Sequence, residues 1–102
     1  MRLQVYTIYD VKAAAYMRPF FMQSDGQAQR AFADLAVDGE HDIGRHPEDY
    51  SLFGIGHFDD DKGAISGEAP RCLCTALEMV ALSQKVDKRQ LNLLDKEVSD
   101  AA

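Results

Sequence analysis

Residues 50–66 read YSLFGIGHFDDDKGAIS, and this stretch decides the fold. Apolar and aromatic residues fill Tyr50–Phe58, a polar cluster ending in Gly63 interrupts them, and Ala64–Ser66 resumes an extended pattern. This arrangement is typical of a β-hairpin with a loop of about three to five residues. Gly63 is expected to supply the positive φ that lets the chain enter the second strand.

Strict alternation along the first hairpin strand places its side chains on two faces. One face carries Phe53, Ile55 and His57, and the other carries Leu52, Gly54, Gly56 and Phe58. Because the second face lacks two side chains, a helix or another backbone is expected to lie close to it. Phe32 and Leu35 are expected to fill this hollow, and the burial of each contributes about 1.5–3 kcal/mol.

The main helix is predicted to cover Asp25 to Val37. Ser24 and Gln27 form a capping-box pattern, in which the hydroxyl accepts from an early helix amide and Gln27 reaches back to the cap. Gly39 is expected to end the helix in a left-handed conformation. The apolar residues at helical spacing are Ala28, Ala31, Phe32, Leu35 and Ala36.

Extended patterns precede this helix. Arg2–Tyr9 alternates and is rich in β-branched and aromatic residues, which predicts a strand. Ala13–Met17 allows a returning strand, although its three consecutive alanines favour helix. Arg18–Met22 contains Pro19, so we expect an edge strand or an extended connection.

The rest of the chain alternates polar and apolar segments. Glu40–Asp49 is polar and predicts a loop that ends in an exposed acidic pair. After Gly67–Pro70, the residues Cys72–Thr75 predict a buried strand and Ala76–Leu82 a short helix, with one continuous helix as the alternative. Val86–Val98 predicts a last helix with few apolar anchors.

These elements predict an α+β fold, in which a small antiparallel sheet of three to four strands packs on one main helix. Residues 1–82 are expected to form a single domain, because chains usually divide only beyond roughly 250 residues. Residues 83–102 are expected to be a C-terminal helix or tail that docks weakly or mediates a dimer.

Seventeen acidic residues against eleven basic residues give a formal net charge of −6. This charge repels phosphate backbones and disfavours a general coating of nucleic acid. No apolar run approaches the ~20 residues that cross a bilayer, so the protein is expected to remain in the cytoplasm where it is made.

Motifs for catalysis and cofactor binding are absent from the sequence, which contains no glycine-rich phosphate loop, nucleophile elbow or cysteine–histidine metal box. We therefore predict no enzyme activity, catalytic residue, cofactor or metal. His41 and His46 with a carboxylate resemble a facial triad, but solvated loop side chains are the expected outcome. Cys72 and Cys74 are spaced unlike redox or zinc motifs and are interpreted as reduced structural thiols.

Several segments resemble the small nonstructural protein of gokushovirus-type microviruses, which are tailless phages with circular single-stranded DNA. The segments are MRLQVYTIYDVKA at 1–13, RPFFM at 18–22, AFAD at 31–34, HPEDYSLF at 46–53, GHFDD at 56–60 with Gly63, and ALE at 76–78. The likeness covers about residues 1–80, and HPEDY is its most specific part. It implies a protein of the host cytoplasm that is absent from the mature capsid, is associated with the phage DNA cycle and is commonly described as DNA-binding. It brings no catalytic residues.

The charge balance favours a non-enzymatic binding module that engages the phage initiator, a host replication protein or the procapsid. Its expected surface is the acidic loop with the hairpin tip: Asp42, Glu48, Asp49, Asp59, Asp60 and Asp61. Self-association as a homodimer is also expected, because an exposed edge strand and a thinly apolar tail need cover.

The alternative function is weak binding of single-stranded DNA, in which tyrosines stack on bases and basic side chains contact phosphates. The expected residues are Arg2, Tyr6, Tyr9, Lys12, Tyr16, Arg18, Lys85, Lys88 and Arg89. A third hypothesis, a small metal hydrolase, requires His41, His46 and His57 to converge.

Overall fold

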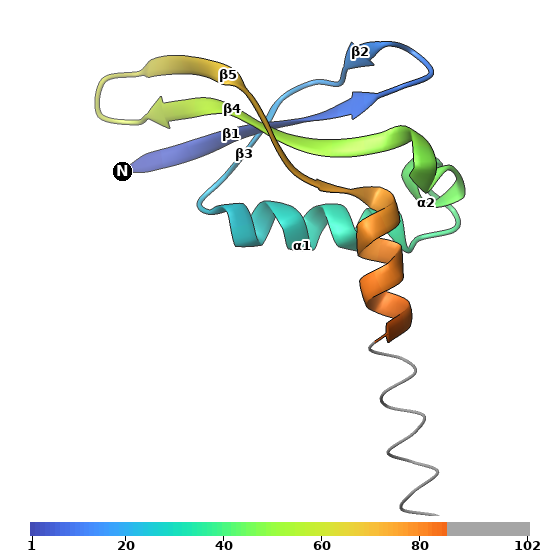
Figure 1. Ribbon diagram of the computed structural model, residues 1–102. Coiled ribbons are helices and arrows are strands. Elements are labelled where there is room, and N and C mark those ends of the chain that lie inside the picture. The colour runs from blue at the N-terminus through green and yellow to red at the C-terminus, as the bar shows by residue number, and fades with distance from the viewer. Residues whose placement is uncertain (86–102) are drawn as a thin grey trace, which may run out of the picture.

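The computed structural model describes residues 1–85 and contains one curled antiparallel sheet with helices on one side (Figure 1). In chain order the elements are β1 (Arg2–Asp10), β2 (Ala15–Tyr16), β3 (Phe20–Met22), α1 (Asp25–Ala36), α2 (Asp42–Arg45), the 3₁₀ turn η1 (Pro47–Asp49), β4 (Tyr50–Asp59) and β5 (Ala64–Thr75). The chain is helical again at 76–85. The α+β prediction is confirmed, with a sheet of five strands where three to four were expected.

β1 and β4 form the centre of the sheet and pair antiparallel along their whole lengths, from Arg2 opposite Asp59 to Asp10 opposite Tyr50. β5 pairs with the other edge of β4, so the order is β2-β1-β4-β5. Gly63, in the connection between β4 and β5, has a φ of +63°. The hairpin predicted at residues 50–66 is therefore confirmed.

β2 and β3 lie along the second edge of β1. Tyr9 faces Tyr16 in β2, and Val5 faces Phe21 in β3. The predicted returning strand and edge strand therefore both exist. Pro19 lies in the connection between them and occupies no position in the ladder, as its missing N–H requires.

β5 differs from the expected short strand after Gly67–Pro70, because it runs without interruption from Ala64 to Thr75. Its pairing with β4 is irregular, since Gly56 faces Gly67 whereas Gly54 faces Arg71. The residues between Gly67 and Arg71, which include Pro70, therefore form a bulge and have no partner on β4. An edge strand tolerates a proline at such a bulge because no neighbouring strand needs its N–H.

α1 begins and ends almost where predicted. The Ser24 hydroxyl accepts from the Gln27 amide at 3.3 Å, but the Gln27 side chain accepts from the Gln23 amide and not from the cap residue. The helix ends at Val37 in a right-handed conformation. Gly39 does not adopt positive φ, so the expected left-handed terminator was wrong.

The core lies between α1 and one face of the sheet. Tyr6 and Ile8 of β1 and Leu52 of β4 meet α1 there, and all three are buried. The buried residues of the helical side are Ala28, Phe32, Ala36 and Ile43. The predicted apolar face of α1 is confirmed at its centre, whereas Leu35 is only half-buried.

The expected hollow at Gly54 and Gly56 does not exist, because the irregular pairing of β4 turns the two glycines to opposite faces. Gly54 pairs with Tyr6 and Gly56 with Val5, and neighbours along β1 point to opposite sides. A Cβ on Gly54 would meet the Arg71 side chain at 3.0 Å, not Phe32 or Leu35.

The same irregularity separates Phe53 from His57, which strict alternation had placed on one face. Phe53 pairs with Thr7, and His57 pairs with Gln4. Thr7 and Gln4 are three residues apart on β1 and therefore point to opposite sides. His57 accordingly lies on the α1 side of the sheet and Phe53 on the other side.

The segment predicted as a loop at Glu40–Asp49 contains α2 and η1 instead. The His41 side chain accepts from the Ile43 amide at 3.2 Å and starts α2, and Ile43 is buried in the core. This apolar anchor explains why the polar segment is ordered. Asp49 is buried, so the expectation of an exposed acidic pair was wrong for this residue.

After β5 the chain turns into helix at residues 76–85, as predicted for Ala76–Leu82. Ala76 is buried, whereas Leu77 and Leu82 are exposed. The predicted helix at Val86–Val98 and most of the predicted tail lie outside the described residues. In the described part, no helix is long and apolar enough to cross a bilayer.

Candidate functional site

Three aromatic rings gather on the sheet face opposite α1, and we call Tyr9, Tyr16 and Phe53 the aromatic patch. The Tyr9 and Tyr16 ring centroids are 4.8 Å apart, and the Phe53 ring meets Tyr16 edge-on at 5.6 Å. Tyr16 is 48% exposed. The patch therefore offers a ring to solvent that is held in place by two others.

Two basic residues flank the aromatic patch in sequence. Lys12 lies in the turn between β1 and β2, and Arg18 follows β2 by two residues. Both side chains are exposed. Cations next to an exposed ring are the combination that single-stranded nucleic acids require.

The other residues proposed for DNA binding do not join this patch. Tyr6 is fully buried, so its expected role as an exposed stacking platform was wrong. Arg2 lies at the opposite end of β1, roughly 23 Å from Tyr9 at ~3.3 Å per residue. Lys85 is exposed on the final described helix, and Lys88 and Arg89 lie outside the described residues.

A polar cluster fastens β1, α1 and β5 together on the α1 side. The Tyr6 hydroxyl donates to Asp25 Oδ1 at 2.7 Å, and Arg71 Nη1 donates to Asp25 Oδ2 at 3.2 Å. The hydrogen bond from Tyr6 and then that from Arg71 lower the pKa of Asp25 below its usual value. Burial and the Asp25 carboxylate raise the pKa of the Tyr6 hydroxyl, so it remains a donor.

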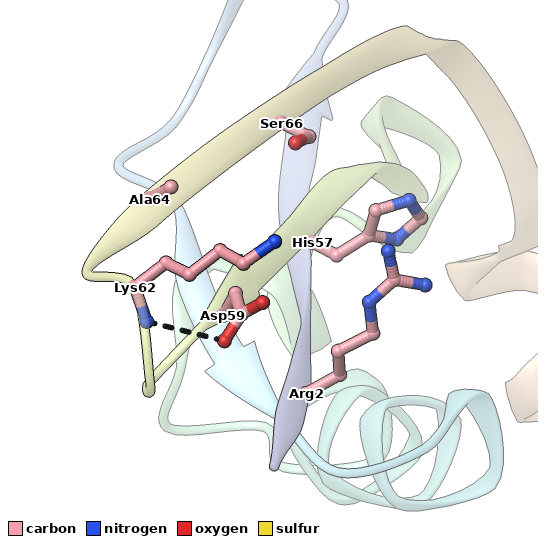
Figure 2. A pocket seen from close by; sticks show the side chains of 6 residues that line it. All are labelled: Arg2, His57, Asp59, Lys62, Ala64 and Ser66. Atoms are coloured by element: carbon pink, nitrogen blue, oxygen red, sulfur yellow. Dashed lines mark hydrogen bonds between the residues drawn. The ribbon is translucent and has the colours of Figure 1, made fainter.

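His57 lies further along the same sheet face. Its Nε2 is 2.6 Å from Glu68 Oε1, and its Nδ1 is 3.3 Å from Gln4 Oε1. The ring is half-buried. Next to it, a pocket of about 120 Å³ opens between the β4–β5 turn and the start of β1 (Figure 2); Arg2, His57, Asp59, Lys62, Ala64 and Ser66 line it.

The two acidic groups proposed for protein binding lie at opposite ends of β4. The first group, Asp42, Glu48 and Asp49, precedes β4, and the second, Asp59, Asp60 and Asp61, ends it. Ten residues of β4 separate them by about 30 Å, so they form two surfaces. Asp42 pairs with Arg45 at 3.4 Å, and Asp60 pairs with the amino group of Met1 at 2.5 Å.

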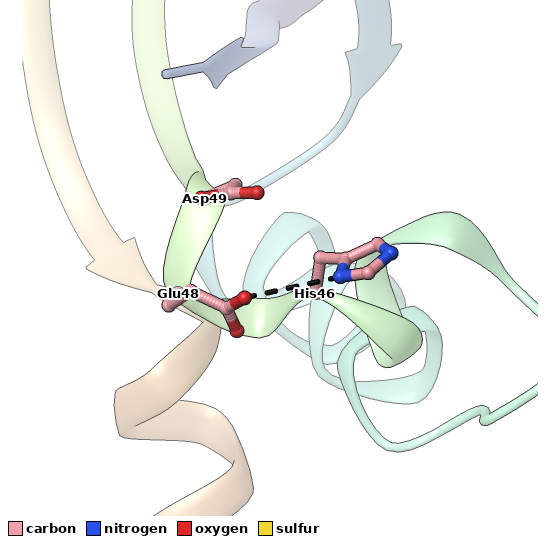
Figure 3. Close-up of side chains that lie close together, drawn as sticks. All are labelled: His46, Glu48 and Asp49. Carbon is pink, nitrogen blue, oxygen red and sulfur yellow. Dashed lines mark ion pairs between the residues drawn. The ribbon is translucent and has the colours of Figure 1, made fainter. Parts of the chain in front are cut away.

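The three histidines proposed for a metal hydrolase have separate surroundings. His46, Glu48 and Asp49 offer ligand atoms within 4.8 Å of one another (Figure 3). His41 caps α2 with its Nδ1, and His57 bonds to Gln4 and Glu68. Within residues 1–85, no group of metal-ligating side chains contains two of the histidines.

Both cysteines are free thiols, Cys72 exposed and Cys74 buried. Burial raises the pKa of the Cys74 thiol to about 11. A thiol with so high a pKa is a poor nucleophile at neutral pH, which agrees with the structural role predicted for it.

Sequence reasoning missed Phe53, Lys62 and Arg71 as members of these surfaces. The order of β1 and β4 brings Phe53 to Tyr9, and the irregular β4–β5 pairing brings Arg71 across Gly54. Of these three residues, only Lys62 could have been found from the local sequence, because the short β4–β5 turn brings it close to His57 on β4.

The fold defines a small α+β protein with a curled antiparallel sheet covered by one main helix on one face. The sequence model of the phage ORF5 protein family matches residues 3–79, and the chain belongs to this family. Protein ORF5 of Chlamydia phage 1 is 37% identical over 67 residues, which are 62% of this chain and 70% of that protein. No solved structure matches the chain.

These matches confirm the resemblance at the level of a microvirus-type phage protein. The chain is therefore a phage accessory protein.

Proposed function

We propose that this phage protein is a non-enzymatic accessory of single-stranded DNA replication or packaging, and that it binds single-stranded DNA weakly through the aromatic patch. The observation that carries the proposal is the exposed Tyr16 ring, braced by Tyr9 and Phe53 on an uncovered part of the sheet. A fixed ring loses little conformational freedom when a base stacks on it.

The charges set the expected strength of binding. A net charge of −6 opposes association with DNA, while Lys12 and Arg18 supply two local phosphate contacts beside the patch. Each base that stacks on an aromatic ring contributes about 1–3 kcal/mol. Modest affinity at low salt is therefore expected, with a logarithmic salt slope near −1.4 from ~0.7 per phosphate contact.

The test is a fluorescence anisotropy titration of a labelled oligothymidylate at two salt concentrations. Tyr16→Ala is expected to weaken binding about 5- to 150-fold, which corresponds to the loss of one stacked base at about 1–3 kcal/mol. Tyr16→Phe is the matched control, because it keeps the ring and removes only the hydroxyl; binding should be retained.

Two outcomes count against this function. Wild-type protein that fails to bind the oligonucleotide at low salt would exclude it. Equal affinities of wild type and Tyr16→Ala would show that DNA binds elsewhere.

Protein binding is the second candidate, favoured by the free outer edge of β5. Every residue from Ala64 to Cys72 is exposed, and β5 is the last strand of the sheet. A partner strand or a second copy of this chain can add to such an edge. Pro70 and the bulge around it protect the middle of the edge, which leaves the residues near Ile65 as the open part.

Light scattering over a range of concentrations tests self-association at this edge. A homodimer is expected for the wild type, and Ile65→Lys is expected to shift it towards monomer, because Ile65 is 65% exposed and a lysine there hinders edge pairing. A strict monomer at high concentration contradicts the homodimer.

A further inference from the structure

We infer that the pocket at the β4–β5 turn, which we call the tip pocket, is a binding site for a single phosphate group. Its charged lining consists of Arg2 at the start of β1, Lys62 in the turn and the carboxylate of Asp59 at the end of β4, with His57 and Ser66 beside them. The tip pocket lies on the α1 side of the sheet, at the opposite end of β1 from the aromatic patch. The inference therefore does not rest on the proposed stacking function.

The two cations of the tip pocket have uncommitted donors. Figure 2 shows the Arg2 guanidinium and the Lys62 amine extending over the same space beside the His57 ring. In the described part of the chain, neither group lies within 4.0 Å of a carboxylate oxygen. Arginine offers a planar fork and lysine a compact point charge, and both suit phosphate oxygens.

Asp59, which lines the tip pocket, and Glu68, which lies beside it, are both hydrogen-bonded within the protein. Asp59 Oδ1 accepts from the backbone amides of Asp61 and Lys62 at 3.0 and 3.3 Å. Glu68 contacts His57 at 2.6 Å. The lining of the tip pocket thus holds two cationic side chains against one carboxylate, so its local charge favours an incoming anion.

The strand ladder holds the pocket walls in register. Arg2 faces Asp59, and His57 faces Ser66, so these side chains share one face of the three-stranded part of the sheet. The Ser66 hydroxyl adds a neutral donor opposite the cations. The paired backbones fix the Cα positions of the lining residues before a ligand binds, so less conformational entropy is lost on binding.

The size of the tip pocket bears on the ligand that it can hold. Its volume of about 120 Å³ gives ample room for one phosphate group. The pocket opens to solvent, so the rest of a larger molecule can lie outside it. The phosphate can therefore come from a free ion, from the end of a DNA strand or from its backbone, with the rest of the molecule outside the pocket.

The test is an NMR titration of ¹⁵N-labelled full-length protein with inorganic phosphate at constant ionic strength, with chloride as the control anion. Saturable shifts are expected for the amides of Lys62, Ala64 and Ser66. The double variant Arg2→Gln with Lys62→Gln should bind at least tenfold more weakly. The matched control, Arg30→Gln with Lys85→Gln, removes the same charge from exposed positions outside both the tip pocket and the aromatic patch and should leave phosphate binding unchanged.

Ser66→Ala serves as a second variant, because it leaves the charges and the exposed strand backbone intact. It should weaken phosphate binding several-fold while the spectrum remains that of the folded protein. Shifts that do not saturate, that spread over the whole chain, or that persist in the Arg2/Lys62 double variant would overturn the inference.

Oligothymidylates with and without a 5′-phosphate distinguish the sources of the group. Preference for the phosphorylated strand assigns the pocket to a strand end, and equal shifts with both strands assign it to the backbone. Shifts at the tip pocket with inorganic phosphate alone assign it to a free phosphate. Failure of Tyr16→Ala to affect DNA binding bears only on the aromatic patch, because inorganic phosphate has no base to stack.

Discussion

Arg71 crosses Gly54 to reach Asp25, and this contact explains the glycine at that position of β4. A Cβ on residue 54 would approach Arg71 Nη2 to 3.0 Å. Asp25 also accepts from the hydroxyl of Tyr6, whose side chain is fully buried. A buried hydroxyl without a partner costs about 1–3 kcal/mol, so Asp25 stabilises the fold through Tyr6 more than through the exposed Arg71.

Asp25→Ala is therefore expected to lower the free energy of unfolding by about 1–3 kcal/mol, because the Tyr6 hydroxyl loses its acceptor. Tyr6→Phe removes the donor together with its need for a partner, so the expected loss is smaller, about 0.5–1.5 kcal/mol. Urea unfolding monitored by circular dichroism measures both variants. A larger loss in Tyr6→Phe than in Asp25→Ala would contradict this ranking.

The same cluster predicts how stability depends on pH. The hydrogen bonds from Tyr6 and Arg71 hold the pKa of Asp25 below its usual value in the folded state. The folded state therefore binds this proton less readily than the unfolded state, whose aspartates titrate near ~3.9. The stabilisation is complete above that pH and is lost as the pH falls through the lower folded pKa.

Asp25→Asn should accordingly show a shallower loss of stability than the wild type as the pH falls below about 4. Urea midpoints at half-unit pH steps measure the difference. Asp34→Asn is the matched control, because Asp34 is an exposed carboxylate of the same helix. Parallel pH profiles for the wild type and Asp25→Asn would contradict the prediction.

At the scale of single elements, the pairing of β4 with β5 depends on Gly56. This residue has a φ of +156°, and a Cβ there would lie 2.1 Å from the backbone oxygen of Ser66. The close approach of the two strands leaves no room for a side chain. Gly67, its partner in the ladder, has open space where a Cβ would be added.

Gly56→Ala is therefore expected to destabilise the protein by about 2 kcal/mol or more, since the clash is with backbone and the conformation is strained. Gly67→Ala should change stability by no more than about 0.5 kcal/mol. Thermal unfolding of the two variants measures the contrast. Similar melting temperatures would show that β5 shifts at no cost.

The elements of this protein differ in how well local residues predict them. Ser24 and Gly63 act on their own neighbours, so the start of α1 and the β4–β5 turn were predictable from sequence. The contact between Arg71 and Asp25 joins residues 46 positions apart and depends on two irregularities in the β4–β5 pairing. Alternation assumes a regular ladder, and it therefore placed Gly56 and His57 on the wrong faces of the sheet.

The residues of the candidate surfaces were likewise only partly predictable from the local sequence. Tyr9 and Tyr16 were proposed as stacking residues from their residue type, but Phe53 joins them only through the β1–β4 pairing. Tyr6 has the same residue type as Tyr9, and only the position of α1 decides that it is buried. Exposure of an aromatic side chain thus depends on which sheet face the helix covers, which periodicity alone does not determine.

At the scale of the whole molecule, α1 covers only part of the sheet. The core residues of the strands come from the centre and far end of β1, from Leu52 and from Cys74. Beyond the start of α1, the sheet continues as the β4–β5 hairpin with the first residues of β1, and β5 is exposed from Ala64 to Cys72 (Figure 1). This end of the sheet is held together by backbone hydrogen bonds between strands, and few of its apolar side chains are buried.

Hydrogen exchange should therefore divide the sheet into two parts. Amides at Tyr6–Ile8 and Leu52 should exchange only through global unfolding, and paired amides near Ile65 through a local opening of lower free energy. Phe32→Leu, in the core, should lower the protection of the first group by about 1 kcal/mol and leave the second unchanged. Ile65→Gly should do the reverse, because it raises the cost of ordering the exposed strand. If Phe32→Leu lowered protection equally at both places, the sheet would open as one unit, and the tip pocket would share the stability of the core.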